Sequence, residues 1–116
     1  MFRITTEKIE KWKSKNNVDK ILKAMNYKDS SIRLAAIKAA GTMKNEQLLN
    51  TLILFLRDDP DPTIRLNAAE ALGKMGVARS QDHLAYVGEN DTDEKVREKA
   101  MEATKEIIAK KMQTEE

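Results

Sequence analysis

The sequence repeats itself at an offset of 32 residues, and the copies align without a gap. Residues 29–43, DSSIRLAAIKAAGTM, match residues 61–75, DPTIRLNAAEALGKM, at 8 of 15 positions. Residues 93–107, DEKVREKAMEATKEI, form a third and more divergent copy. The shared columns are Asp29/Asp61/Asp93, Ile32/Ile64/Val96, Arg33/Arg65/Arg97, Ala36/Ala68/Ala100 and Ala39/Ala71/Ala103. A fixed period of this length predicts an array of similar units that bury a core by stacking on one another.

Each copy carries the signals of a helix that begins at its aspartate. An aspartate at the N-cap accepts hydrogen bonds from orphan amides and faces the positive end of the helix dipole. Pro62 follows Asp61 at the first helical position, where proline is tolerated. Gly41 and Gly73 stand where a helix is expected to end or to pack closely. Apolar residues recur at helical spacing between these signals, which predicts one amphipathic helix in each copy.

Another amphipathic stretch precedes each of these helices, over residues 18–27, 45–57 and 80–88. Asn45 and Ser80 are the expected N-caps of the latter two stretches. Each unit is therefore predicted to be a helix, a short turn and a second helix.

Additional helical segments are expected at the two ends of the array. A helix at residues 6–15 precedes it, with Ile9 and Trp12 on one face. The last helix is expected to run to about residue 112, with Ile107, Ile108 and Met112 extending its apolar stripe. Such ends cap the apolar faces that a stack would otherwise expose. We expect a single domain over residues 1–116, with a cap helix at 6–15 and repeats at about 17–44, 45–76 and 80–112.

The composition favours helices throughout. The chain is 41% hydrophobic but only 4% aromatic, so its core must consist mainly of Ala, Leu, Ile and Met, which suits closely packed helices. It has no cysteine, which excludes disulfides and thiolate metal sites. The sequence has no apolar signal run, and no stretch approaches the roughly 18 apolar residues of a membrane span. We expect an all-α, cytoplasmic protein that does not contact a membrane.

The motif D-x-x-I/V-R-x-x-A-x-x-A-L-G, clearest from Asp61 to Gly73, resembles the HEAT-like repeat family, in particular its short-repeat type seen in phycobilisome (PBS) lyase-type proteins. The resemblance covers about residues 18–108. It implies a right-handed α-α superhelix, or alpha solenoid, of three helical-hairpin repeats with an N-terminal capping helix.

The same resemblance implies a ladder of aspartates and arginines between the repeats. Each arginine lies four residues after an N-cap aspartate and is expected to pair with that aspartate or with the one in the next unit. The alternative is that the three guanidinium groups bind phosphates or acidic peptides. The predicted ladder consists of Asp29, Arg33, Asp61, Arg65, Asp93 and Arg97.

The acidic run at residues 58–61 does not match a calcium loop. A loop of the EF-hand type needs a glycine at its sixth position, and counting from Asp59 places Ile64 there. We interpret Asp58 and Asp59 as solvent-exposed turn residues and Asp61 as the cap of the following helix.

Patterns typical of catalytic sites are missing from the sequence. His83 is the only histidine, so no histidine cluster is available for iron or zinc and no Ser-His-Asp arrangement is supported. Residues 73–76, GKMG, do not form a phosphate-binding loop. We therefore expect no catalytic residue, no metal ligand and no cofactor.

The second helices of the hairpins are expected to line the inner face of the stack, where their polar columns form a strip. Leu34 and Leu66 lie one unit apart and are expected to be exposed anchors for a partner helix or peptide. The strip comprises Leu34, Lys38, Leu66, Asn67, Glu70, Lys99 and Glu102. The leading hypothesis is a non-catalytic scaffold or adaptor that binds a segment of a partner protein there.

Charge supports a second hypothesis. Residues 1–44 carry 11 Lys/Arg and 4 Asp/Glu, a net charge of +7, whereas residues 45–116 have a net charge of −5. A basic patch with an aromatic side chain, as at Lys8, Lys11, Trp12 and Lys15, is typical of nucleic-acid binding. The alternative function is therefore a nucleic-acid-binding module. The uneven charge also suggests head-to-tail association of the basic N-terminal end with the acidic C-terminal end, and we expect a monomer or weak self-association.

Overall fold

The computed structural model describes residues 3–114. Within this range the chain forms seven α-helices and one short 3-10 turn, with no β-strand. The elements are α1 (Thr6–Ser14), α2 (Val18–Met25), α3 (Ser30–Ala40), α4 (Glu46–Asp58), α5 (Pro62–Met75), η1 (Ala78–Ser80), α6 (Gln81–Asn90) and α7 (Glu94–Thr114). The prediction of an all-α fold is confirmed.

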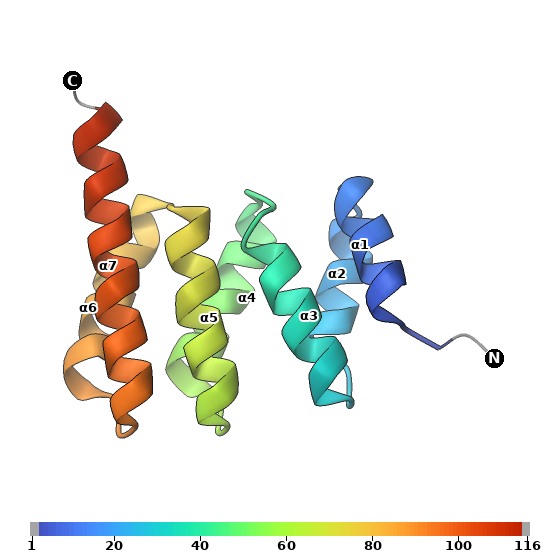
Figure 1. Cartoon of the computed structure of the whole chain (residues 1–116), viewed down its shortest axis with the longest axis horizontal. Coiled ribbons are helices and arrows are strands. Elements are labelled where there is room, and N and C mark those ends of the chain that lie inside the picture. The colour runs from blue at the N-terminus through green and yellow to red at the C-terminus, as the bar shows by residue number, and fades with distance from the viewer. Residues whose placement is uncertain (1–2, 115–116) are drawn as a thin grey trace.

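The helices pack in sequential pairs, α2 with α3, α4 with α5 and α6 with α7, and α1 packs against the first pair. Figure 1 shows the second helices α3, α5 and α7 in front, together with α1, and the first helices α2, α4 and α6 behind them. The chain runs from one end of this two-layered stack to the other. The architecture is a short α-solenoid of helical hairpins.

The second helices begin at the aspartates that the sequence indicates. Each side chain accepts a hydrogen bond from an amide of the first turn, at 2.9 Å for Asp29 and Asp61 and 3.1 Å for Asp93. Asn45 caps α4 in the same way, through the amide of Leu48. These N-cap predictions are confirmed.

The connection between α5 and α6 differs from the prediction. Gly76 ends α5 with φ of 70°, in the left-handed region that glycine adopts without a steric penalty. Ser80 does not cap α6, because its hydroxyl donates to the carbonyl of Val77 at 2.8 Å. The chain enters α6 through the 3-10 turn η1, which takes the place of the expected side-chain cap.

The core is aliphatic and runs through every repeat. Its fully buried large side chains include Ile9, Ile21, Ile37, Leu48, Leu52, Leu72, Leu84 and Ile107. Small residues bring the second helices together: a Cβ on Gly41 would lie 2.9 Å from Cα of Ala71, and one on Gly73 would lie 2.9 Å from Cβ of Ala103. The second helices are therefore closer to one another than the first helices are, which places them on the inner radius of the stack.

The apolar stripe of α7 is shorter than the sequence predicts. Ile107 is buried, but Ile108 and Met112 are exposed. Met101 is exposed as well, although Ile37 and Ala69, which occupy the same position in the two preceding repeats, are buried. In residues 3–114 no fourth unit covers this side of α7, which is the physical reason for the difference.

No helix in the described part of the chain combines the length and the apolar character that crossing a membrane requires.

Candidate partner-binding surface

The predicted strip residues come from α3, α5 and α7, whose solvent-facing sides adjoin in the second-helix layer. Lys38 and Glu102 are exposed, whereas Leu34 and Leu66 are half-buried and pack against the core. The expectation of exposed leucine anchors is therefore wrong. Packing against the core leaves only part of each leucine accessible.

Two of the predicted strip residues are joined across the α5–α7 interface. The Lys99 ammonium lies 3.5 Å from the Glu70 carboxylate on α5 and 3.1 Å from Glu102 on its own helix. The hydrogen bond to Glu102, followed by the charges of both carboxylates, raises the pKa of Lys99. The Asn67 amide is also engaged, since it donates to the carbonyl of Thr63 at 2.8 Å. Much of the polar strip is thus held in place by neighbouring groups.

Two further large apolar side chains are exposed on the first helices, which the sequence did not lead us to expect. Leu54 on α4 is 60% exposed and Tyr86 on α6 is 52% exposed. They occupy one column of the repeat, since they are 32 residues apart. The Arg57 guanidinium stacks over the Tyr86 ring at 4.2 Å from its centroid and lies 3.1 Å from Nδ1 of His83. The first-helix layer therefore carries its own apolar and cationic features, which the 32-residue alignment could have revealed.

An ion-pair ladder does link successive repeats. Arg33 donates through Nη2 to the carboxylate of Asp59 at 2.9 Å. Arg65 donates through Nε and Nη2 to both oxygens of Asp91, at 2.9 and 3.1 Å. Each pair joins a second helix to the turn after the first helix of the next unit, 26 residues further along the chain. Arg97 donates through Nη1 to the backbone carbonyl of Asp91 at 2.6 Å, a bond within its own repeat that matches the one from Arg65 to the carbonyl of Asp59.

The aspartates of this ladder differ from the predicted ones. Asp29, Asp61 and Asp93 form no ion pair with an arginine in residues 3–114, because their carboxylates face the first-turn amides of their own helices. The arginines pair instead with Asp59 and Asp91, two residues before the cap in each turn. The first copy has Tyr27 in this column, so the alignment did not reveal it as an aspartate column.

Asp59 is therefore a structural residue and not the solvent-exposed turn residue that the sequence predicts. Its side chain is only 9% exposed, and its second oxygen accepts a 2.9 Å hydrogen bond from the amide of Asp61. Asp58 is exposed, as expected. Among residues 3–114, no three or more His, Cys, Asp or Glu side chains are arranged to hold a metal ion.

Asp91 has the same double role in the next turn. Partial burial raises the pKa of this carboxyl, but the hydrogen bonds from Arg65 and from the amide of Asp93, together with the charge of Arg65, outweigh burial. The pKa of Asp91 is consequently lowered, and the hydrogen bond to Asp91 raises the pKa of Arg65. Both groups are fully charged at neutral pH.

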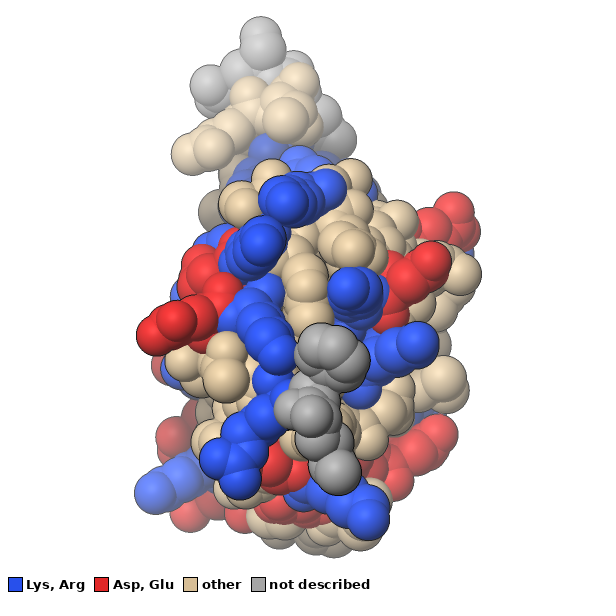
Figure 2. All heavy atoms as spheres, turned by 90° about the vertical axis from the view of Figure 1, so that its right-hand side faces the viewer, with Lys and Arg blue, Asp and Glu red and all other residues tan. Residues whose placement is uncertain are grey.

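The four residues of the alternative nucleic-acid patch do come together at the N-terminal end of the stack. Lys8, Lys11, Trp12 and Lys15 line one hollow of about 390 Å³ with two neighbouring residues of α2 and its cap. Figure 2, which looks at this end, shows Lys and Arg side chains over much of the face. The Trp12 ring is partly buried, and the Lys20 ammonium lies 5.4 Å from its centroid. This cation–π contact occupies one face that a base would need for stacking.

A stack of helical hairpins with small residues and ion pairs between its units defines the class of helical repeat proteins. Comparison with protein families finds a match to HEAT repeats over residues 7–105. The chain therefore belongs to the HEAT repeat family. Comparison with curated proteins finds no match. HEAT repeat domains are typically protein-interaction scaffolds and are generally non-catalytic.

Proposed function

We propose that this chain is a non-catalytic scaffold that binds a segment of a partner protein on the face lined by α3, α5 and α7. The observation that carries the proposal is the continuity of this face across all three repeats. Small residues between the second helices bring their outer surfaces into one strip on the inner radius of the stack. An inner surface of this kind touches a bound segment at several repeats simultaneously, as is usual for solenoid proteins.

The character of the strip indicates what kind of segment it binds. The accessible outer atoms of Leu34 and Leu66 provide modest apolar contact one repeat apart. Lys38 at one end is exposed and forms no ion pair within the described chain, whereas Glu102 lies at the other end. A partner helix or extended peptide with a few apolar side chains and an uneven charge fits this strip.

The test is affinity capture with the 116-residue chain, comparing two matched double variants by quantitative mass spectrometry. Lys38→Glu with Asn67→Arg alters the strip, and Lys23→Glu with Gln47→Arg makes the same kinds of change on exposed positions of the first-helix layer. We expect proteins captured by the original chain to be retained by the first-helix variant and lost by the strip variant. Equal capture by the strip variant would contradict the proposal, provided that circular dichroism shows unchanged helicity.

Nucleic-acid binding at the N-terminal end is the second candidate, supported by the shared hollow of Lys8, Lys11, Trp12 and Lys15. If it is correct, a labelled single-stranded oligonucleotide shifts in a mobility assay at low salt, and the shift weakens steeply as salt rises. Lys11→Glu with Lys15→Glu should then abolish the shift. No retained DNA or RNA at low salt removes this candidate.

A further inference from the structure

Two hollows lie together on the edge of the stack where the chain passes from one repeat to the next. The first has a volume of about 370 Å³ and lies between Lys44 at the start of α4 and Arg79 after α5. The second, of about 320 Å³, lies between Lys44 and the C-terminal part of α7. Lys44 lines both hollows. Val77 lines the first, and its neighbours Gly76 and Ala78 line the second. The two hollows therefore adjoin at Lys44, and together we call them the linker groove.

The linker groove has an aliphatic floor. Leu49 and Ile107 are almost completely buried beneath it, and Val77 is half-buried within it. None of the residues that line either hollow is aromatic, so the groove offers no platform on which a nucleic-acid base can stack. The floor instead suits an aliphatic side chain.

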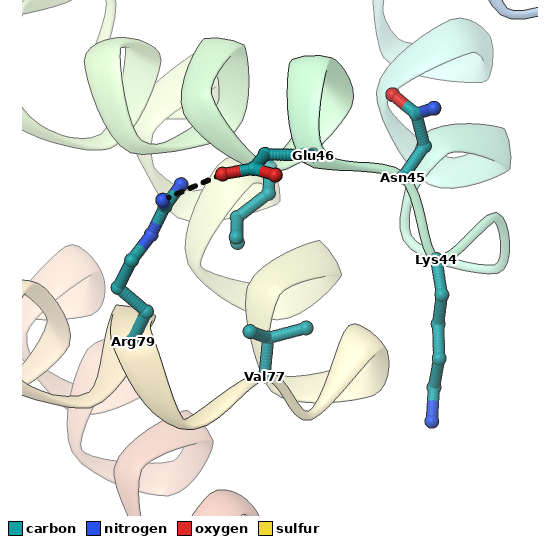
Figure 3. Close-up of a pocket in the computed structure, with 6 residues that line it drawn as sticks. Lys44, Asn45, Glu46, Val77 and Arg79 are labelled. Carbon is teal, nitrogen blue, oxygen red and sulfur yellow. Dashed lines mark hydrogen bonds and ion pairs between the residues drawn. The ribbon is translucent and has the colours of Figure 1, made fainter.

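The rim of the linker groove is positively charged. It contains four cations, Lys44, Arg79, Lys110 and Lys111, and one carboxylate, that of Glu46. Glu46 pairs with Arg79 at 3.0 Å, and Figure 3 shows this pair on one side of Val77 while Lys44 extends away from it. Lys44 and Lys111 are exposed and form no ion pair within residues 3–114. The Lys110 ammonium donates to a backbone carbonyl of α5 at 2.9 Å.

The direction of α7 accounts for two of the four cations on this edge. Lys110 and Lys111 lie near the C-terminus of α7, where lysines complement the negative end of the helix dipole. Lys44 and Arg79 instead precede α4 and α6, which begin on this edge. On the opposite edge the second helices begin, and their caps are the aspartates Asp29, Asp61 and Asp93.

We propose that the linker groove binds an extended acidic peptide segment that places one aliphatic side chain against the accessible part of Val77. Carboxylates on either side of that residue meet Lys44 and Arg79 in one hollow and Lys110 and Lys111 in the other. The site is separate from the second-helix strip, so its existence does not depend on the function proposed for that strip.

The experiment measures fluorescence anisotropy with a short labelled peptide in which glutamates flank one leucine. The original chain should bind it, and Lys44→Glu with Lys111→Glu should weaken binding about tenfold or more, because two attractive contacts become repulsive. The variant with Lys44→Arg and Lys111→Arg keeps both positive charges and should bind the peptide as well as the original chain does. Replacing the leucine of the peptide by glycine should also weaken binding about tenfold, since the burial of one aliphatic side chain is lost.

A matched control distinguishes this site from general attraction to a basic protein. Lys11→Glu with Lys15→Glu changes charge equally at the N-terminal end and should leave peptide binding unchanged. The proposal is overturned if this control weakens binding as much as the groove variant, if the glycine peptide binds as well as the leucine peptide, or if the original chain does not bind. Displacement of the peptide by a single-stranded oligonucleotide that binds the groove more tightly would also overturn it. Strip variants are expected to bind the peptide normally, so failure here is separable from failure of the scaffold proposal.

Discussion

The two interfaces between successive repeats are built from the same motif but are held together differently. In the first interface, α3 meets α5, and Arg33 reaches Asp59 through a single nitrogen. In the second, α5 meets α7, and Arg65 holds both oxygens of Asp91. Figure 1 shows α5 and α7 running almost parallel, whereas α3 is inclined to α5. We infer that the second interface is the stronger of the two.

The difference comes from how each guanidinium uses its donors. Arg33 gives its Nε to the carbonyl of Met25 at 2.8 Å and stacks over the Phe55 ring, 4.9 Å from its centroid. It reaches Asp59 through Nη2 alone. Arg65 gives Nη1 to the carbonyl of Asp59, so Nε and Nη2 remain for a bidentate pair. Bidentate pairs are stronger and more specific than single contacts. Identical residues at the same position of two repeats can therefore form different interactions.

The largest effect is expected from filling the closest contact between repeats. Gly73→Leu forces α5 away from Ala103 and should lower the free energy of unfolding by roughly 3 kcal/mol or more. Gly41→Leu should cost less, about 1–2 kcal/mol, because α3 lies against α5 over a shorter length. Urea denaturation followed by circular dichroism measures both. A greater loss for Gly41→Leu would reverse the proposed order of the two interfaces.

Removing the ladder carboxylates should give the next largest effect. Asp91→Asn leaves the partly buried Arg65 without its charge partner and should cost about 2–3 kcal/mol, whereas Asp59→Asn should cost about 1 kcal/mol. Asp58→Asn, on an exposed neighbour, is the matched control and should change stability by less than about 0.5 kcal/mol. The comparison fails if the Asp58 and Asp91 variants are equally stable.

The pH dependence of the free energy of unfolding should depend on the Arg65–Asp91 ion pair of the second interface. The pKa of Asp91 is lowered in the folded chain, so the unfolded state binds its proton more readily. The stabilisation is complete above the ordinary aspartate pKa of 3.8 and is lost as the pH falls through the lower folded value. Thermal unfolding between pH 6 and pH 2 should thus show a fall in Tm, and Asp91→Asn should make that fall shallower. An unchanged slope in the variant would mean that the ion pair does not contribute to acid sensitivity.

The smallest effect is expected from introducing into the α3–α5 interface a surface ion pair that the α5–α7 interface already has. Glu70 and Lys99 bridge α5 and α7, whereas Lys38 and Asn67 occupy the matching positions between α3 and α5. Lys38→Glu with Asn67→Lys introduces the missing pair and should raise stability by no more than about 0.5 kcal/mol. The gain should disappear at high salt, when the same urea titration is repeated in 1 M sodium chloride. A gain that persists in salt would assign it to helix propensity instead.

The sequence predicted the parts of the fold that depend on local signals. The aspartate caps, the helical spacing and the paired order of the helices follow from residues close together in the chain, and the structure confirms them. The prediction for Ser80 is wrong because its hydroxyl donates to the carbonyl of Val77 within a 3-10 turn, and a local pattern does not distinguish such a turn from a side-chain cap.

The contacts between repeats were only partly predictable. The arginine column indicated that a ladder exists, but its partner lies 26 residues away, and Asp59 and Asp91 stand in a column that begins with Tyr27. The exposure of the strip was also misjudged, because how deeply Leu34 sinks depends on how closely α3 approaches α5. The spacing of residues along one helix does not predict how closely that helix approaches its neighbour.

The most direct test of this account is a double-mutant cycle on Arg65, using Arg65→Met with Asp91→Asn in one cycle and with Asp93→Asn in the other. If the ladder joins each arginine to the turn of the next repeat, Arg65 and Asp91 should couple by about 1–3 kcal/mol in the free energy of unfolding. Arg65 and Asp93 should couple by less than about 0.5 kcal/mol, because the Asp93 carboxylate is bound to the amide of Val96. Coupling to Asp93 with none to Asp91 would contradict the ladder and the stack that rests on it.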